Sequence, residues 1–270
     1  MDLNTITAVA RPEARSELPV WAAGDAWLGG GTWLFSEPQA HLNRLIDLAG
    51  LNWPALTVDA KGLSIAATCT IAELDAMICP PDWLAAPLIG QCCRAFLASF
   101  KIWKTATVGG NLCMSLPAGP MISLTSALDG ICTIWQADGG ERRIAVSDFV
   151  TGNQTNVLKR GDLLRGIDIP LAALKRRSAF RQMSLTPVGR SAALLIGTIA
   201  HDGAFTLTVT ASTKRPIKLS FGQLPGVAEL REAILQTIPD GLYHDDIHGK
   251  PFWRKHMTLR LACEIRNELA

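Results

Sequence analysis

The sequence predicts an α+β fold, and three observations support this prediction. Hydrophobic residues make up 48% of the 270 residues and charged residues only 19%, which is typical of a chain that folds around a buried core. Short apolar runs that end at Gly or Pro predict strands, and longer runs with helical spacing of apolar residues predict helices. No long-period repeat recurs, which excludes solenoid and propeller architectures.

The formal charge is +2, from 26 basic and 24 acidic residues, and this balance argues against nucleic-acid or membrane-surface binding. The N-terminus lacks a secretion signal, and no segment approaches the roughly 20 apolar residues of a membrane span. We therefore expect a cytoplasmic protein without a membrane span. The seven cysteines include no C-x-x-C pair, so we expect free thiols and no metal site in this chain.

The first part of the chain alternates strands with loops. A strand at Trp27-Leu28 leads into a glycine loop, and we expect a helix after that loop. The short apolar run over 44–48 predicts a second strand. Residues 56–60 and 63–67 flank Lys-Gly and predict a β-hairpin.

Two helices are predicted next. Thr70 and Glu73 have the spacing of a capping box, which predicts a short helix through Met77. The spacing of Leu88, Cys92, Phe96 and Phe100 predicts a longer helix over 87–100 that leads directly into a second glycine loop.

The rest of the sequence predicts further strands and helices, which fall into two units on either side of residues 175–177. Basic residues at 175–177 interrupt the hydrophobic pattern and mark a boundary, so we predict domains over 1–54, 55–172 and 173–270. The last domain is expected to hold a small antiparallel sheet and helices. The expected elements are a helix over 123–128, strands over 131–135, 142–146, 164–169, 192–200, 204–210 and 214–219, and a final helix over 252–269.

Two glycine-rich segments carry the functional signal. They are Gly29-Gly30-Gly31-Thr32 and Thr107-Val108-Gly109-Gly110-Asn111. Glycines allow positive φ and leave bare N–H groups, so two such loops predict a clamp on a diphosphate, made by loops rather than by a helix dipole. The first segment fits neither the G-x-G-x-x-G fingerprint nor the P-loop, and alone it is explained equally well by a flexible turn.

The motifs around the second segment resemble a known family. Thr107-Val108-Gly109-Gly110-Asn111, then residues 115–119 and Ala127-Leu128-Asp129, resemble the FAD-binding (medium) subunit of the molybdenum hydroxylases, the family of xanthine dehydrogenase and carbon monoxide dehydrogenase. Gly29-Gly30-Gly31-Thr32 is similar to the first flavin motif of that family, and residues 63–74 are similar to its strand-to-helix segment. Further matching segments follow in order: Asp148-Phe149, Thr151-Gly152, Gly161-Asp162-Leu163-Leu164, Ile167-Asp168-Ile169-Pro170, Phe180-Arg181-Gln182 and Phe252-Trp253-Arg254-Lys255. The resemblance implies a two-subdomain FAD-binding fold of the vanillyl-alcohol-oxidase (PCMH) type.

The resemblance also implies which residues hold the FAD. It places the two glycine segments on the diphosphate, the side chains of Leu97, Ala98 and Leu164 against its rings, and Arg181 where relatives often carry a lysine close to the flavin. No catalytic residue that acts on a carbon substrate is expected. The implied cofactor-binding residues are Leu28, Gly29, Gly30, Gly31, Thr32, Trp33, Leu34, Leu97, Ala98, Thr107, Gly109, Gly110, Asn111, Leu164 and Arg181.

By the same resemblance, the chain is an electron-transfer subunit. Electrons would reach its FAD from two [2Fe-2S] clusters of a small subunit, after oxidation of substrate at the molybdenum cofactor of a large subunit, and would leave to an external acceptor. A dimer of such heterotrimers is the expected assembly. The substrate and the acceptor stay open.

Two alternatives stay open beside this interpretation. One is a stand-alone flavoprotein oxidoreductase, and the other is a flavin-free scaffold subunit of the same fold. The scaffold is considered because Trp33, Trp103 and Pro120 depart from the residues common in relatives. The five histidines lie outside the motifs, and we expect surface or packing roles for them: His41, His201, His244, His248 and His256.

Overall fold

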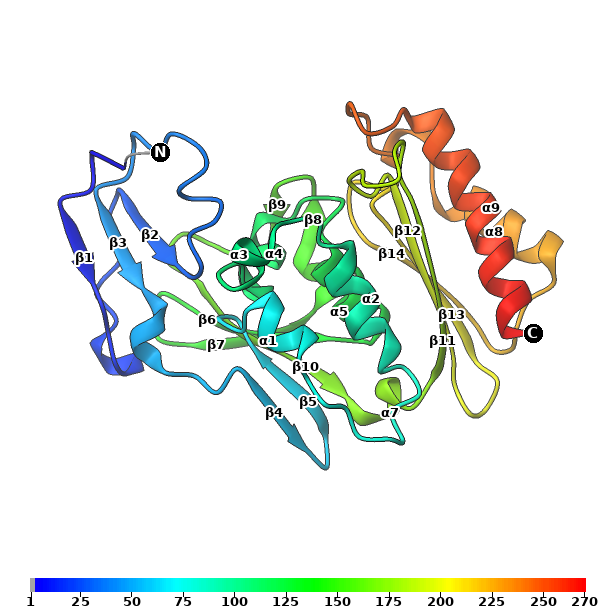
Figure 1. Cartoon of the computed structure of the whole chain (residues 1–270), viewed down its shortest axis with the longest axis horizontal. Helices are drawn as coiled ribbons and strands as arrows, with labels where there is room; N and C mark the ends of the chain where they lie inside the picture. The colour runs from blue at the N-terminus through cyan, green and yellow to red at the C-terminus, as the bar shows by residue number, and fades with distance from the viewer. Residues whose placement is uncertain (1–2) are drawn as a thin grey trace.

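A computed structural model describes residues 3–270 as three parts in a row, each built on its own sheet (Figure 1). Residues 1 and 2, which begin the predicted first domain, lie outside the described residues. Within 3–270, no helix is both long enough and apolar enough to cross a bilayer. The strands and helices are given below part by part, and three short 3-10 turns lie at Arg15–Glu17, Leu48–Leu51 and Asp240–Leu242.

The N-terminal part is a three-stranded parallel sheet with the order β1-β3-β2. Its strands are β1 (Ala8–Ala10), β2 (Asp25–Leu28) and β3 (Arg44–Asp47). The strands predicted at 27–28 and 44–48 are confirmed, whereas three-residue β1 carries no sequence pattern. The indole N–H of Trp27 donates to the carbonyl of Asp162 at 2.9 Å, which joins this sheet to the middle part.

The helix expected after the first glycine loop is wrong. Residues 32–36 form only a turn, in which the N–H of Phe35 donates to the carbonyl of Gly31 at 2.9 Å. Pro38 follows closely, and a proline disfavours helical backbone at the residue before it. The chain therefore leaves the turn as a loop and returns to β3.

The middle part is a five-stranded antiparallel sheet with the order β4-β5-β10-β6-β7. The predicted hairpin is confirmed, since β4 and β5 pair from Leu56 opposite Ile65 to Asp59 opposite Gly62. A separate short hairpin joins β8 and β9. The strands are β4 (Leu56–Asp59), β5 (Gly62–Ala66), β6 (Ile131–Trp135), β7 (Glu141–Ala145), β8 (Val150–Gly152), β9 (Thr155–Asn156) and β10 (Leu163–Pro170).

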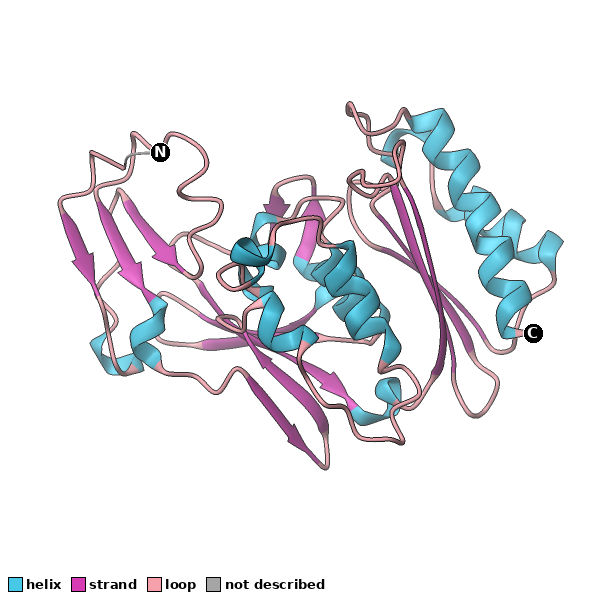
Figure 2. Ribbon diagram, in the orientation of Figure 1, coloured by secondary structure: helices cyan, strands magenta, loops and turns pink. Residues whose placement is uncertain are grey.

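Short helices cover the middle sheet (Figure 2). They are α1 (Ile71–Asp75), α2 (Pro87–Ala95), α3 (Phe100–Trp103), α4 (Val108–Met114), α5 (Pro120–Ala127), α6 (Val146–Phe149) and α7 (Leu171–Leu174). The predicted capping box of α1 is confirmed, because Thr70 Oγ1 accepts the N–H of Glu73 and the Glu73 carboxylate accepts the N–H of Thr70.

The long helix expected over 87–100 is wrong, because it ends at Ala95. Leu88 and Cys92 of the predicted apolar face are buried, but Phe100 is 69% exposed and starts the separate helix α3. The indole N–H of Trp103 donates to the carbonyl of Phe96 at 3.1 Å, which holds the connection between the two helices. The chain therefore leaves helical backbone between α2 and α3 despite the helical spacing of its apolar residues.

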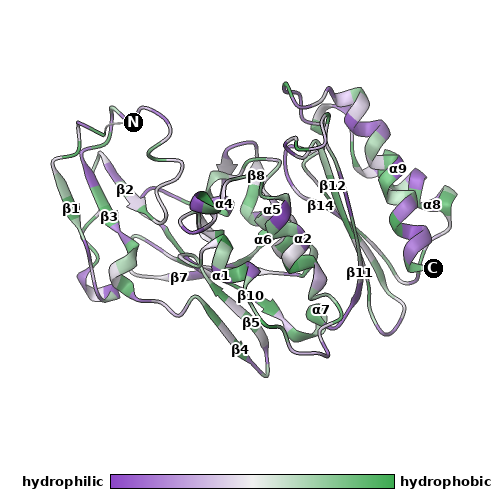
Figure 3. Cartoon of the chain, in the orientation of Figure 1, coloured by the Kyte–Doolittle hydropathy of each residue, from purple (hydrophilic) through white to green (hydrophobic). Residues whose placement is uncertain are grey.

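The C-terminal part is a four-stranded antiparallel sheet, β11 (Arg177–Met183), β12 (Ala193–Ile199), β13 (Phe205–Thr210) and β14 (Ile217–Phe221). One face packs on α8 (Val227–Thr237) and α9 (Pro251–Leu269), and the other face packs on α2 and α5 (Figure 1). Hydrophobic and hydrophilic residues mix along α9, as expected for a helix with one buried side (Figure 3). The sheet therefore serves two cores, one on each face.

Asp25 at the start of β2 is the buried anchor of the N-terminal sheet. Its carboxylate accepts hydrogen bonds from Arg44 of β3 at 2.8 and 2.5 Å and from the N–H of Ala22 at 2.7 Å. The hydrogen bonds from Arg44, above all, hold the pKa of Asp25 below its ordinary value of 3.8.

We expect Asp25→Asn to lower the free energy of unfolding at pH 7. A carboxyl whose pKa is lowered by folding stabilises the fold above its unfolded pKa, and this contribution is lost as the pH falls through the folded pKa. The difference between variant and wild type should therefore shrink below about pH 4 in urea unfolding curves. Asp245→Asn, on an exposed pair with Lys250, is the control that should show little difference at either pH.

Candidate functional site

The two glycine segments lie against each other in the structure. A Cβ built on Gly30 would lie 1.5 Å from the carbonyl oxygen of Thr105, and one on Gly29 would lie 3.2 Å from Oγ1 of Thr107. Backbone therefore packs directly on backbone, which only glycine permits at position 30. The contact joins the end of β2 to the segment that precedes α4.

The second segment is the start of a helix and not a loop, so the prediction of a loop there is wrong. Thr107 is the N-cap of α4, and its Oγ1 accepts the N–H of Gly110 at 3.0 Å. The N–H groups of Val108, Gly109 and Asn111 donate to the carbonyls of Cys69, Ala67 and Thr107 at 2.8, 3.0 and 3.0 Å. Every backbone donor from Val108 to Asn111 is thus used inside the protein, and none is left for a ligand.

The two glycines of this helix start have different roles. A Cβ on Gly109 would lie 2.5 Å from Cβ of Ala67, so Gly109 lets α4 pack on the residue that follows β5. Gly110 is exposed, and a Cβ there would meet only Oγ1 of Thr107, at 2.9 Å. Gly110 therefore leaves an open surface beside the first glycine segment.

The first segment, in contrast, offers backbone donors. None of the N–H groups from Gly30 to Leu34 donates to an acceptor in residues 3–270. Gly31 is buried and has φ of +69°, a backbone conformation that favours glycine. Consecutive unpaired N–H groups in a turn form a concave site for an anion, so this turn has the chemistry of a phosphate cradle.

Exposed apolar side chains follow the first glycine segment and precede the second along the chain. Of the predicted residues, Trp33 is 36% and Leu97 57% exposed, while Leu28, Leu34 and Ala98 are half-buried. Three further exposed side chains lie on the same two stretches and were missed by the sequence analysis: Phe35, Phe100 and Ile102. Phe35 could have been found from the sequence, because aromatic residues stand directly after the glycine run. These side chains provide surfaces on which a flat ring can pack.

Two predicted residues have side chains that are engaged inside the protein. Leu164 of β10 is 2% exposed inside the middle core, so its side chain has no open surface. Arg181 of β11 forms ion pairs with Glu264 and Glu268 of α9 at 3.1 and 2.7 Å. Successive residues of a strand point to opposite faces, so Arg181 faces α9 while Phe180 faces the middle part. In this structure the side chain of Leu164 offers no open surface, and the guanidinium of Arg181 is paired with α9.

The side chain of Asn111 links α4 to α5 within the middle part. Its Oδ1 accepts the N–H of Met121 at 3.1 Å and so fixes the first turn of α5. Pro120 occupies the first position of that helix, where a missing N–H has no cost. The Nδ2 group of Asn111 donates to no acceptor within residues 3–270 and is available to a ligand.

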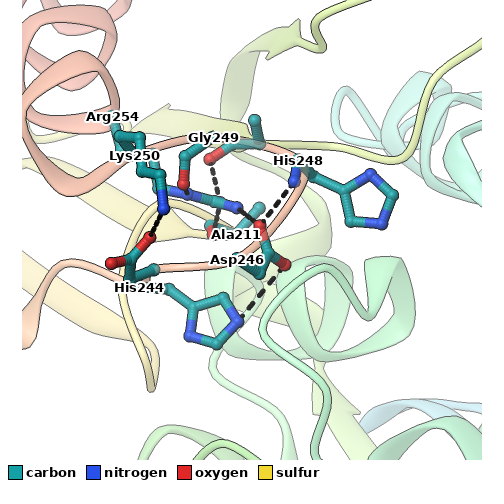
Figure 4. A network of polar contacts seen from close by, with 9 residues as sticks. Ala211, His244, Asp246, His248, Gly249, Lys250 and Arg254 are labelled. Carbon is teal, nitrogen blue, oxygen red and sulfur yellow. Dashed lines mark hydrogen bonds and ion pairs between the residues drawn. The ribbon is translucent and has the colours of Figure 1, made fainter.

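A separate cavity of about 270 Å³ lies between the middle and C-terminal parts. The buried side chain of Arg254 forms one wall, and it donates to the carbonyls of Gly249, Ala192 and Ala211 at 2.9, 2.6 and 2.6 Å (Figure 4). Asp246 neutralises Arg254 at 2.5 Å and lies 3.3 Å from Nε2 of His244, whose pKa is lowered by burial. This network ties the loop before α9 to the C-terminal sheet.

We looked for side chains that could together bind a metal ion in the described part of the chain and found no such group. Residues 3–270 contain no group of three His, Cys, Asp or Glu side chains placed to hold a metal ion.

Comparison with known proteins assigns this arrangement to a family. Residues 20–172, more than half of the chain, match the family described as the FAD binding domain in molybdopterin dehydrogenase. The chain belongs to this family, and the predicted FAD-binding domain is confirmed. It is 25% identical over 197 residues to caffeine dehydrogenase subunit beta of Pseudomonas sp. (strain CBB1). The matched region covers 66% of this chain and 61% of that protein. The chain thus spans less than two thirds of that relative.

Solved structures show the same fold. Carbon monoxide dehydrogenase from Oligotropha carboxidovorans matches with a TM-score of 0.81 and 19% identity, over 98% of this chain and 97% of that chain. Quinoline 2-oxidoreductase from Pseudomonas putida 86 matches with a TM-score of 0.78 and 18% identity, over 99% of both chains. These likenesses confirm the predicted α+β fold, with an antiparallel C-terminal sheet after the FAD-binding part.

We expect Arg254→Ala to lower the free energy of unfolding by about 3 kcal/mol, because it leaves Asp246 and three buried carbonyls without their partner. Chemical denaturation followed by circular dichroism measures this change. Lys250→Ala removes a lysine from an exposed ion pair in the same loop and should cost less than about 1 kcal/mol. Equal effects of the two substitutions would contradict the anchoring role of Arg254.

Proposed function

We propose that this chain is the FAD-binding, electron-transferring subunit of a molybdenum-containing dehydrogenase. In this proposal it receives electrons from [2Fe-2S] clusters of a partner subunit and passes them through FAD to an external acceptor. The observation that carries the proposal is the preformed turn of unpaired N–H groups from Gly30 to Leu34 next to the open surface at Gly110. Membership of the FAD-binding family supports the same ligand.

The residues present fit a flavin dinucleotide. The N–H groups of the first glycine segment, with the half-buried Thr32 beside them, would hold the diphosphate. Gly110 would give the cofactor room to pass, and the side chains of Trp33, Leu97 and Ala98 would pack against its rings. Bound FAD supplies the redox chemistry, and the protein supplies binding, orientation and exclusion of water.

The partners follow from the relatives and belong to the proposal. Caffeine dehydrogenase subunit beta is, by its name, one subunit of a multi-subunit dehydrogenase. We infer a large subunit with the molybdenum cofactor and a small subunit with two [2Fe-2S] clusters, assembled as a dimer of heterotrimers. In the chain itself, we propose that residues 1–54 and 55–172 hold the FAD between them and that 173–270 form the third domain.

Purification of the chain from its own cells tests the proposal and its alternatives. We expect the yellow absorption of oxidised flavin, release of FAD on denaturation, and co-purification with iron and molybdenum. A colourless chain that takes up no added FAD would identify the flavin-free scaffold instead. A flavin-loaded chain without metal-containing partners would identify a stand-alone oxidoreductase.

We expect Gly110→Val to weaken FAD binding by at least about 100-fold, or about 2.7 kcal/mol, while the overall fold stays intact and Oγ1 of Thr107, 2.9 Å from the new Cβ, shifts locally. The branched side chain would occupy the open surface beside the first glycine segment. Flavin fluorescence titration of the cofactor-free chain measures the affinity, and circular dichroism checks the fold. Gly222→Val, at a glycine with nothing within 4 Å of its Cβ position, is the control and should bind FAD normally. Normal FAD affinity in Gly110→Val would refute this location of the site.

A further inference from the structure

Phe35 packs its ring on the first glycine segment. A Cβ built on Gly31 would lie 2.4 Å from Cε2 of Phe35 and 3.1 Å from Cδ1 of Leu28. The ring therefore occupies space that exists only because Gly31 has no side chain. The Phe35 side chain is 44% exposed, so one part of it packs on the loop and the rest faces outward.

The backbone of Phe35 closes the same turn. Its N–H donates to the carbonyl of Gly31 at 2.9 Å, and both the N–H and Oγ of Ser36 donate to the carbonyl of Trp33, at 3.0 and 2.9 Å. These bonds hold residues 32–36 in a single turn, and the N–H groups at the start of that turn have no partner within it. Phe35 thus contributes both a ring and a backbone bond to the conformation that exposes the donors.

Glycine runs lose more conformational freedom on ordering than any other sequence. A loop with Gly29, Gly30 and Gly31 would be expected to sample many conformations unless something held it. Ordering even one or two residues at the moment of binding weakens an affinity by about tenfold. A side chain that orders the loop beforehand removes that cost.

We propose that Phe35 is a positioning residue, whose ring preforms the first glycine loop so that the N–H groups from Gly30 to Leu34 are ready to bind a diphosphate. The proposal rests on the FAD-binding function proposed above. Phe35 acts through the loop and needs no contact with the cofactor. The opposite arrangement, in which the ring blocks the donors, predicts the opposite effect of removing it.

Titration of the cofactor-free chain with FAD, and with ADP as a diphosphate without the flavin, tests this role. We expect Phe35→Ala to raise the Kd of both ligands about tenfold or more. Phe35→Leu, which keeps an apolar side chain over Gly31, should lie between Phe35→Ala and wild type, at about threefold. Phe252→Ala removes an 85% exposed phenylalanine at the start of α9 and should leave both affinities unchanged.

Hydrogen exchange gives a second readout that a loss of global stability would not reproduce. In Phe35→Ala without cofactor, the amides of Phe35 and Ser36 should exchange faster, while those of the C-terminal sheet stay protected. Unchanged exchange, or FAD binding as tight as or tighter than wild type, would overturn the proposal. If Phe35→Ala does not fold, Phe35→Leu decides, because behaviour identical to wild type in both measurements would overturn it.

Failure of this inference is distinct from failure of the proposed function. Wild-type chain that binds neither FAD nor ADP would contradict the function itself. Wild-type chain that binds both, with a Phe35→Ala variant that binds them equally well, would contradict only the role of Phe35.

Discussion

The architecture of the candidate site depends on one contact between two stretches of backbone. Gly30 lies against the carbonyl of Thr105 at a distance that no side chain would allow. This contact brings a turn of the N-terminal part next to the helix start of the middle part. Without it, the unpaired N–H groups after β2 and the open surface at Gly110 would not form one site.

The two glycine motifs look alike in sequence but differ in physical role. In the first, glycines allow positive φ and leave amides without partners. In the second, Gly109 allows close packing on Ala67 and Gly110 leaves clearance, while every amide is bonded inside the protein. The first segment thus provides donors for an anion, and the second segment provides room for a ligand. A side chain added in the first segment strains the backbone that presents the donors, whereas one added in the second fills space.

The C-terminal part completes the core of the middle part while its other face carries α8 and α9. Leu194, Ile196 and Ala211 join the core below α2 and α5, and Ser123 of α5 is 2.6 Å from Oγ1 of Thr210. The buried Arg254 network ties the start of α9 to the ends of two strands. The sheet therefore supports α2 and α5, and α5 in turn packs on α4, the helix that carries the second motif.

The sequence by itself determined the α+β class, the β4–β5 hairpin, the capping box at Thr70 and Glu73, and the family, because each depends on local turn chemistry or on motifs in a fixed order. Only the tertiary structure decided where the helix after Pro87 ends, that the second glycine motif starts a helix, that the side chain of Leu164 is buried, and that Arg181 pairs with α9. The last three features depend on partners far away in the chain, such as the carbonyls of Ala67 and Cys69 for the second motif and the carboxylates of α9 for Arg181. The end of α2 coincides with a more local bond, from the indole of Trp103 to the carbonyl of Phe96. Spacing and composition describe what a segment prefers alone, whereas hydrogen bonds and burial across the fold decide which preference is satisfied.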